Sequence, residues 1–177
     1  MSSLRGLLWP AATSFLLLQK IRSHRSFNSK DKREFIPYSE ITVVGKDNNW
    51  ILSYDGRTRC PTWVLETIKK NEILSHDLTI VNRKKATFYP EPIIRNSNIS
   101  VHPKEYNHSG FNRGHMIPAA DFRSSQESLN GTFTMANICP QNAALNQGFW
   151  STFEAWIRSL LFSPDGFEEI NIITGYI

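Results

Sequence analysis

The chain has 177 residues and is 40% hydrophobic and 20% charged, which suits a single globular domain with a packed core. Its net charge of +4 permits a nucleic-acid partner without requiring one, especially because several basic residues stand near the N-terminus. Its two cysteines, Cys60 and Cys139, are too few for a disulfide-rich scaffold, and their spacing resembles no zinc site. Two buried free thiols are favoured, and a single disulfide stays open as the alternative.

Residues 1–30 are predicted to be a targeting leader rather than part of the fold. They contain no Asp or Glu, carry five Lys or Arg residues, and include an apolar run over residues 7–18. Acid-free leaders with Arg and Ser are typical of mitochondrial transit peptides, whereas a secretory signal or an uncleaved anchor associated with a membrane stays open. The run is short for a membrane span, which needs about 20 residues. Residues 31–48 are predicted to be a linker, and residues 49–177 the folded domain.

The first half of that domain offers one strand and one helix candidate. Residues 50–54 (WILSY) are apolar and aromatic and precede the turn signal Asp55-Gly56, which predicts a strand. Residues 61–71 (PTWVLETIKKN) have a proline at a plausible first helical position and apolar side chains on one side, which predicts a short amphipathic helix. Residues 76–109 are polar and interrupted by prolines, so we expect extended loop there.

The second half predicts the order strand, loop, strand, helix, strand. Residues 111–120 are strand-like and lead into a loop, and residues 132–138 (TFTMANI) are a second strand candidate. Residues 146–162 carry apolar side chains with a period near 3.6, which predicts a helix. Residues 170–174 (INIIT) predict a buried strand.

Polar side chains at the junctions of these elements fit the hydrolysis of a phosphodiester bond. His115, at the end of the first strand, titrates near neutral pH and can act as a general base toward water. Arg113 keeps its charge and can bind phosphate oxygens with two N–H groups at once. Asn146, at the start of the helix, offers an amide oxygen suited to Mg²⁺, which would stabilise the leaving oxygen. Glu154 shares a broad helix face with Asn146 and can reach metal-bound waters.

Each candidate also has an ordinary structural interpretation. His115 follows a glycine, as turn residues commonly do, and Asn137 would cap the end of the second strand. Asn146 would be a helix N-cap, a position that favours asparagine, and Glu154 would form a surface salt bridge. The joint order and spacing of these residues, rather than any one of them, favours catalysis.

Four separated blocks of the sequence resemble the DNA/RNA non-specific endonucleases of the ββα-metal fold, in particular the branch of mitochondrial endonuclease G and its exonuclease-G-like relatives. The blocks are residues 106–121 (YNHSGFNRGHMIPAAD), 132–133 (TF), 137–141 (NICPQ) and 145–154 (LNQGFWSTFE). They occur in the family's order with familiar gaps, and the pattern can be followed over about residues 49–174.

The resemblance implies an α+β fold with a mixed or antiparallel sheet and flanking helices. It also implies a role for each candidate: His115 as general base, Asn146 as metal ligand, Arg113 as phosphate contact, Asn137 as a support of the site, and Glu154 as the residue that orders metal-bound waters. The expected activity is cleavage of DNA and RNA with little sequence preference, with Mg²⁺ or Mn²⁺ as cofactor. The family commonly forms homodimers.

Two departures from the family's pattern leave an alternative function open. Asn112 stands where the family usually has Asp, and the chain stops just after residues 170–175 (INIITG), where the family continues with further strands. The alternative is a catalytically silent, truncated homologue that dimerises with or regulates a longer relative. A nucleic-acid-binding module without catalysis has less support, because the central region lacks a dense stripe of Lys and Arg.

Overall fold

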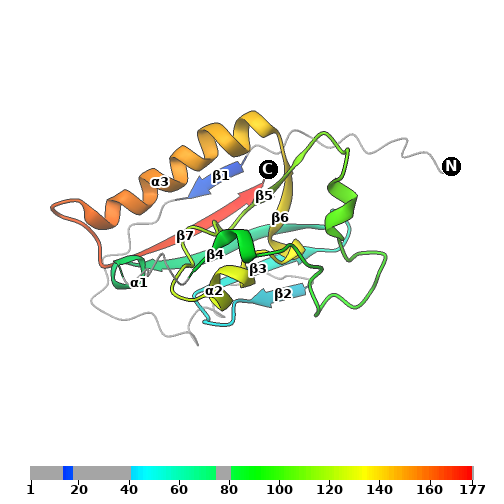
Figure 1. The fold of residues 1–177 in the computed structure, drawn as a ribbon, viewed down its shortest axis with the longest axis horizontal. Helices are drawn as coiled ribbons and strands as arrows, with labels where there is room; N and C mark the ends of the chain where they lie inside the picture. The colour runs from blue at the N-terminus through cyan, green and yellow to red at the C-terminus, as the bar shows by residue number, and fades with distance from the viewer. Residues whose placement is uncertain (1–13, 18–40, 75–80, 177) are drawn as a thin grey trace.

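A computed structural model describes residues 14–17, 41–74 and 81–176 of the chain (Figure 1). Its larger sheet has the strand order β1-β7-β4-β3-β2, and each pairing in it is antiparallel. These strands are β1 (Ser14–Leu17), β2 (Ile41–Val44), β3 (Trp50–Asp55), β4 (Cys60–Lys69) and β7 (Glu169–Tyr176). A separate two-stranded antiparallel sheet, which we call the hairpin, pairs β5 (Asn112–His115) with β6 (Ile138–Gln141). The connection between its strands contains the short helices α2 (Gln126–Gly131) and η4 (Met135–Asn137).

The helical segments are short, apart from one that lies over the large sheet (Figure 1). That segment is continuous over a π-helix, η5 (Leu145–Trp150), then α3 (Ser151–Ser159) and the 3₁₀ turn η6 (Leu160–Phe162), which confirms the predicted helix. The others are α1 (Lys70–Leu74), η2 (Arg83–Lys85), η3 (Pro103–Tyr106), α2 (Gln126–Gly131) and η4 (Met135–Asn137). The predicted strands over residues 50–54 and 170–174 are confirmed as β3 and β7.

The predicted amphipathic helix over residues 61–71 is wrong, because this segment forms most of β4, which pairs with β3 on one side and β7 on the other. Most of β4 is buried, and a strand covered on both faces loses the alternation of apolar and polar residues that reveals a strand. Pro61 stands near the start of β4, where the register with β3 shifts beside Tyr54, a position at which a strand tolerates proline.

The predicted strand over residues 132–138 begins too early. The chain turns after α2 and passes through η4 before β6 starts at Ile138. The Thr132 hydroxyl donates to the carbonyl of Leu129 (2.8 Å), and the Thr134 hydroxyl accepts from the N–H of Ala136 (3.3 Å). Threonines that bond to nearby backbone in this way favour caps and turns over strands. Asn137 therefore stands just before the second strand of the hairpin rather than at its end.

Two hydrophobic clusters pack against one face of the large sheet. In the first, Val64 of β4 contacts the region of the β5–β6 hairpin, and in the second, Ile68 of β4 contacts Ile157 and Leu161 of the long helical segment. Val64 and Ile68 share a face of β4 because alternate residues of a strand point the same way. The hairpin and the helix that carry the candidate residues therefore cover the same face of the sheet.

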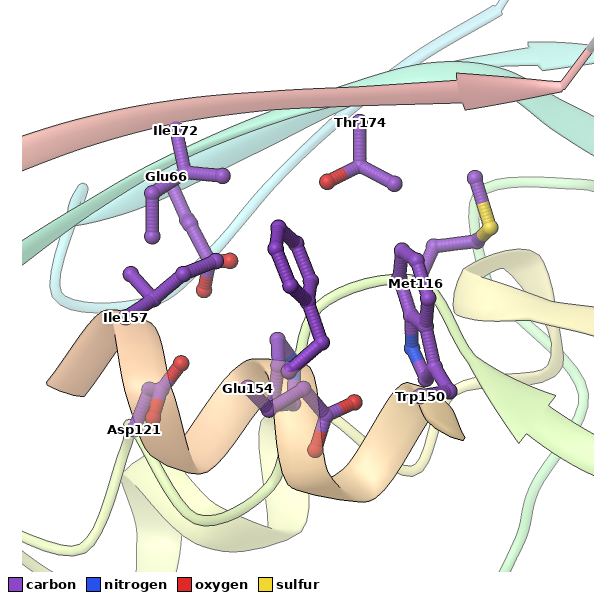
Figure 2. A pocket seen from close by; sticks show the side chains of 10 residues that line it. Glu66, Met116, Asp121, Trp150, Glu154, Ile157, Ile172 and Thr174 are labelled. Carbon is purple, nitrogen blue, oxygen red and sulfur yellow. The ribbon is translucent and has the colours of Figure 1, made fainter. Parts of the chain in front are cut away.

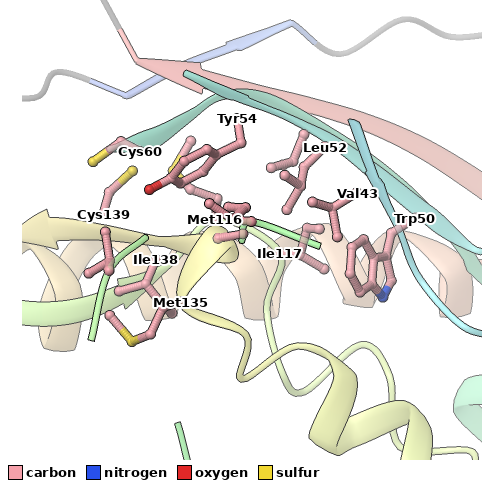
Figure 3. Close-up of a cluster of buried hydrophobic side chains, with 14 of the residues drawn as sticks. Val43, Trp50, Leu52, Tyr54, Cys60, Met116, Ile117, Met135, Ile138 and Cys139 are labelled. Carbon is pink, nitrogen blue, oxygen red and sulfur yellow. The ribbon is translucent and has the colours of Figure 1, made fainter. Parts of the chain in front are cut away.

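Both cysteines are free and buried in the first of these clusters. Figure 3 shows the side chains of Cys60 from β4 and Cys139 from β6 pointing toward one another. Two buried free thiols, the arrangement that the sequence favours, are thus found where the hairpin meets the sheet.

The N-terminal predictions fall largely outside the described residues. Within the predicted leader, residues 14–17 form β1, which pairs with β7 at one edge of the sheet. The strand β2 lies within residues 31–48, the predicted linker, so the sheet begins before residue 49. In the described part of the chain, no helix has both the length and the apolar character needed to cross a membrane.

Candidate functional site

The hairpin fixes His115 at the end of its first strand. His115 ends β5 and pairs with Ile138, the first residue of β6. The preceding Gly114 is required by packing, because a Cβ atom there would lie 2.2 Å from the side chain of Gln141 on the neighbouring strand. The Arg-Gly-His spacing therefore places the two candidate side chains on either side of a position where any side chain would have to displace that of Gln141.

Asn137 is fully buried next to the start of β6, and its side chain forms hydrogen bonds with backbone groups. Its Oδ1 accepts from the N–H of Ile117 (2.9 Å), and its Nδ2 donates to the carbonyls of Ile117 (3.1 Å) and Thr132 (2.9 Å). The carbonyl of Asn137 also accepts from the N–H of Met116 (3.0 Å). These bonds hold the chain directly after His115, so Asn137 can set the position of that residue.

The imidazole of His115 is 8% exposed and lies against two phenyl rings. Its centroid is 5.4 Å from that of Phe88 and 4.9 Å from that of Phe133, the latter edge to face. Burial, and then the positive charge of Arg83, lower the pKa of His115 from 6.5 to about 3. The ring is therefore neutral at neutral pH, and the expectation from the sequence that His115 titrates near neutral pH is wrong, because burial disfavours the charged ring. Among the described residues its buried Nε2 has no hydrogen-bond partner. A neutral imidazole is the form that can accept a proton.

Two arginines contact the same pair of phenyl rings that the imidazole of His115 contacts. The guanidinium of Arg113 lies 4.7 Å from the ring centroid of Phe88, and that of Arg83 lies 5.3 Å from the ring centroid of Phe133. The two phenyl rings are themselves in contact, with centroids 4.9 Å apart. Cation–π contacts of this kind hold guanidinium groups in place while leaving N–H donors available to a ligand.

Arg83 was not a candidate from the sequence. It begins η2, a short basic 3₁₀ turn that the side chain of Asn82 caps by accepting from the N–H of Lys84 (2.9 Å). The signal available in the sequence was the run Arg-Lys-Lys within a polar loop, but nothing local links that run to His115. Long-range folding alone brings them together.

Asn146 lies inside the helical segment rather than at its start. The cap is Asn142, whose Oδ1 accepts from the N–H of Ala144 (2.8 Å), while the N–H of Asn146 donates to the carbonyl of Asn142 (2.9 Å). Within the described residues no hydrogen bond occupies the half-buried side-chain amide of Asn146. Its π-helical context is a feature frequently found at functional sites. The amide oxygen is thus available to a hard cation.

Glu154 is half-buried on α3 and lines a small cavity with Glu66 and Asp121 (Figure 2). Burial and the charge of Asp121 raise the pKa of Glu154 to about 7, against the opposing charges of Arg158 and Arg83. The charge of Arg83 thus lowers the pKa of both His115 and Glu154, in each case less than burial shifts it. No group of three or more His, Cys, Asp or Glu side chains in the described residues is arranged to hold a metal ion. A cation here would depend on amide oxygen and water.

Comparisons with known proteins show what the whole chain is similar to. A family model described as "DNA/RNA non-specific endonuclease" matches residues 35–177. The protein named "Nuclease EXOG, mitochondrial" of Mus musculus is 38% identical over 134 residues, which are 76% of this chain and 34% of that protein. "Endonuclease G, mitochondrial" of Homo sapiens is 31% identical over 127 residues, which are 72% of this chain and 40% of that protein.

A solved structure is similar as well. It is titled "Crystal structure of the EndoG/EndoGI complex: Mechanism of EndoG inhibition", and it matches with a TM-score of 0.73 and 27% identity over 85% of this chain and 60% of that one. This likeness confirms the α+β fold of the ββα-metal type predicted from the sequence. The chain spans little more than a third of the length of the curated relatives that it matches.

Proposed function

The chain belongs to the DNA/RNA non-specific endonuclease family, and from that premise we propose that it hydrolyses phosphodiester bonds of DNA and RNA with Mg²⁺ or Mn²⁺ as cofactor. Phosphate contacts carry no sequence information, so cleavage with little sequence preference is consistent with a site built around the nucleic-acid backbone. Because the chain spans a minor part of its relatives' length, the activity and the substrates belong to this proposal.

One observation carries the proposal: the neutral imidazole of His115 packs against two phenyl rings, and each of these rings has an arginine guanidinium over it. In this proposal His115 takes a proton from the attacking water, which its neutral ring is able to do. Arg113 and Arg83 bind oxygens of the scissile phosphate and offset the negative charge that grows in the transition state. Asn137 positions His115 through its bonds to the backbone of Ile117.

Asn146 is the proposed metal ligand, because no described residue forms a hydrogen bond with its side-chain oxygen, and because amide oxygens suit Mg²⁺ and Mn²⁺. When bound, such an ion would stabilise the leaving oxygen as a Lewis acid. Glu154, on the same helical segment, would accept hydrogen bonds from waters beside Asn146 and so orient them. Asn146 and Glu154 thus have separate tasks, one as a ligand and the other as an acceptor.

A plasmid-nicking assay with matched RNA and DNA substrates tests the proposal. We expect cutting by the wild-type chain with Mg²⁺, loss with EDTA, and a loss of at least about 100-fold in His115→Ala, as expected when a general base is removed. Lys104→Ala, on an exposed turn, is the control and is expected to cut normally. Equal cutting by His115→Ala and the wild type would remove His115 from the mechanism.

A catalytically silent homologue is the second candidate, and the asparagine at position 112 favours it. Asn112 begins β5 and pairs with Gln141, one residue before Arg113. A neutral amide there gives Arg113 or a metal-bound water no charged partner. Cooperative thermal unfolding without metal-dependent cutting would favour this candidate, and Asn112→Asp would then be expected to gain activity.

The location and assembly of the protein are part of the proposal. The relatives are named mitochondrial, which supports a mitochondrial location and favours a transit peptide over the secretory alternative for residues 1–30. Nucleic acid is the proposed partner. A homodimer and a membrane association through the leader stay predictions, which analytical ultracentrifugation and vesicle flotation of the full chain would test.

A further inference from the structure

Glu66 places a carboxyl group between the two hydrophobic clusters. It lies in the middle of β4, two residues from Val64 in one cluster and two from Ile68 in the other, on the face that the hairpin and α3 cover. Its side chain is among the fully buried ones, with 2% of the residue exposed, and its Oε2 has no hydrogen-bond partner in the part of the chain that the structure describes. A lone buried carboxylate is costly, so the group needs a proton or a partner.

The cavity beside Glu66 gathers two more carboxyl groups, and among the described residues Arg158 is the cation that acts on Glu66. Figure 2 shows Glu66 from β4, Asp121 from the loop between β5 and α2, and Glu154 from α3 around it. The guanidinium of Arg158, one helical turn after Glu154, donates to Asp121 Oδ1 at 2.6 Å. Arg158 is therefore committed to Asp121, and the remaining positive charge that acts on Glu154 belongs to the exposed Arg83.

The charge balance requires a proton on this cluster. With Asp121 ionised against Arg158, an ionised Glu66 would be a negative charge with no partner inside an apolar layer. Burial, followed by the charges of Asp121 and Glu154, holds the pKa of Glu66 well above its ordinary value. The pKa values of Asp121 and Glu154 are raised less, to about 6 and about 7. Glu66 is thus the group that keeps its proton at neutral pH.

The size of the cavity suits a single water molecule that bridges the carboxyl groups. It offers about 10 Å³ to the centre of a water molecule, near the lower limit for one ordered water. A buried water typically makes about three hydrogen bonds. The three carboxyl groups around the cavity supply that number if one of them donates and the other two accept.

We propose that Glu66 is a neutral carboxylic acid that donates through one cavity water to Asp121 and Glu154, and so positions Glu154 for the reaction. The protonation of Glu66 and its water-mediated bonds to Asp121 and Glu154 are argued from the cavity alone. The effect on catalysis rests on the function proposed above. Glu66 is in this view a positioning residue: it reaches no substrate and acts through the carboxylate on α3.

Infrared difference spectroscopy tests the protonation without any activity. At neutral pH, the difference spectrum between the wild type and Glu66→Gln is expected to show the C=O stretch of one neutral carboxyl group. Glu168, whose side chain is 85% exposed, provides the control, and the difference spectrum between the wild type and Glu168→Gln is expected to show no such band. A spectrum in which Glu66→Gln removes carboxylate bands instead would overturn the proposal, whether or not the chain cuts nucleic acid.

Kinetics test the positioning role. Glutamine keeps a neutral donor, so Glu66→Gln is expected to retain the wild-type rate, whereas Glu66→Leu is expected to lose about 10-fold in kcat and to need more Mg²⁺ for half-maximal rate. If the wild type cuts and both variants lose activity equally, the proposed water-mediated positioning is wrong. If the wild type does not cut, the proposed function fails while the infrared result still decides the state of Glu66.

Discussion

The guanidinium of Arg113 lies over the ring of Phe88, 4.7 Å from its centroid, and the imidazole of His115 contacts the same ring, with the two ring centroids 5.4 Å apart. The ring of Phe88 thus contacts both the proposed phosphate-binding residue, Arg113, and the proposed general base, His115. Phe88 lies in the loop before η3, far from the hairpin in sequence. The shape of the site therefore depends on a loop that carries none of the family's quoted motifs.

Replacing this ring tests its part in substrate binding. Phe88→Leu keeps an apolar side chain but removes the cation–π contact, which is worth about 0.5–1 kcal/mol near a surface and predicts a loss of about two- to fivefold in kcat/KM, mainly through KM. Steady-state cutting of a defined duplex measures it. Phe162→Leu, an exposed phenylalanine on η6, is the control. An unchanged KM in Phe88→Leu would contradict the idea that this ring holds Arg113.

The buried imidazole predicts a pH dependence of stability. The pKa of His115 is lowered to about 3 in the folded chain, so as pH falls below 6.5 the unfolded chain binds this proton first. The free energy of unfolding should therefore fall by up to about 1 kcal/mol per pH unit from this group between pH 6.5 and pH 3. Urea unfolding of the wild type and of His115→Leu at several pH values measures the difference, because the variant lacks the titrating ring. Parallel curves for the two proteins would show that His115 is not held neutral.

The elements that could be predicted from the sequence are those that bury one face and expose the other. Elements buried on both faces, or shaped by local hydrogen bonds, could not be predicted. The long helical segment was predictable because it presents one apolar face to the sheet, and β4 was not, because it is covered on both faces and pairs with two neighbours. The loop after α2 was misjudged because its threonines bond to local backbone. Such contacts depend on the folded backbone rather than on residue type.

The candidate site divides in the same way. The candidates on the hairpin and the helix were named from the order of motifs in the sequence, and their roles stay predictions. Arg83 was not named, because its link to His115 runs through Phe133 and arises only from tertiary packing. The backbone bonds of Asn137 were equally invisible, because their partners lie in two loops whose conformations no local pattern specifies.

The pair Asp121–Arg158 should be essential for stability as a pair. Arg158 is the cation bonded to a buried carboxylate, so Arg158→Gln leaves an unpaired charge and is expected to cost about 3 kcal/mol in the free energy of unfolding. The double variant Asp121→Asn with Arg158→Gln removes both charges and should recover part of that loss. Chemical denaturation of the two singles and the double forms a complete cycle. A double variant as unstable as the sum of the singles would argue against direct coupling.

The two cysteines should be unreactive in the folded protein. Contact with Cys60 and burial raise the pKa of the Cys139 thiol, and both side chains are almost fully enclosed. Only the thiolate reacts readily, so iodoacetamide at pH 8 should label neither cysteine in the native chain and both in denaturant. Mass spectrometry of the intact chain counts the labels. Rapid labelling of the native protein would show that the contact between the hairpin and the sheet opens easily.

Asn142 and Asn146 provide a matched pair that separates helix capping from metal binding. Asn142 caps the helical segment through the N–H of Ala144, so Asn142→Ala should cost about 1 kcal/mol in stability and leave metal-dependent cutting intact. Asn146→Ala removes a half-buried amide with no side-chain partner in the described residues, so it should leave the thermal midpoint nearly unchanged while abolishing cutting and weakening Mn²⁺ binding. Calorimetry of Mn²⁺ binding and thermal unfolding of both variants would measure these effects. The opposite pattern, with stability lost in Asn146→Ala and metal binding lost in Asn142→Ala, would move the proposed metal ligand one turn toward the hairpin.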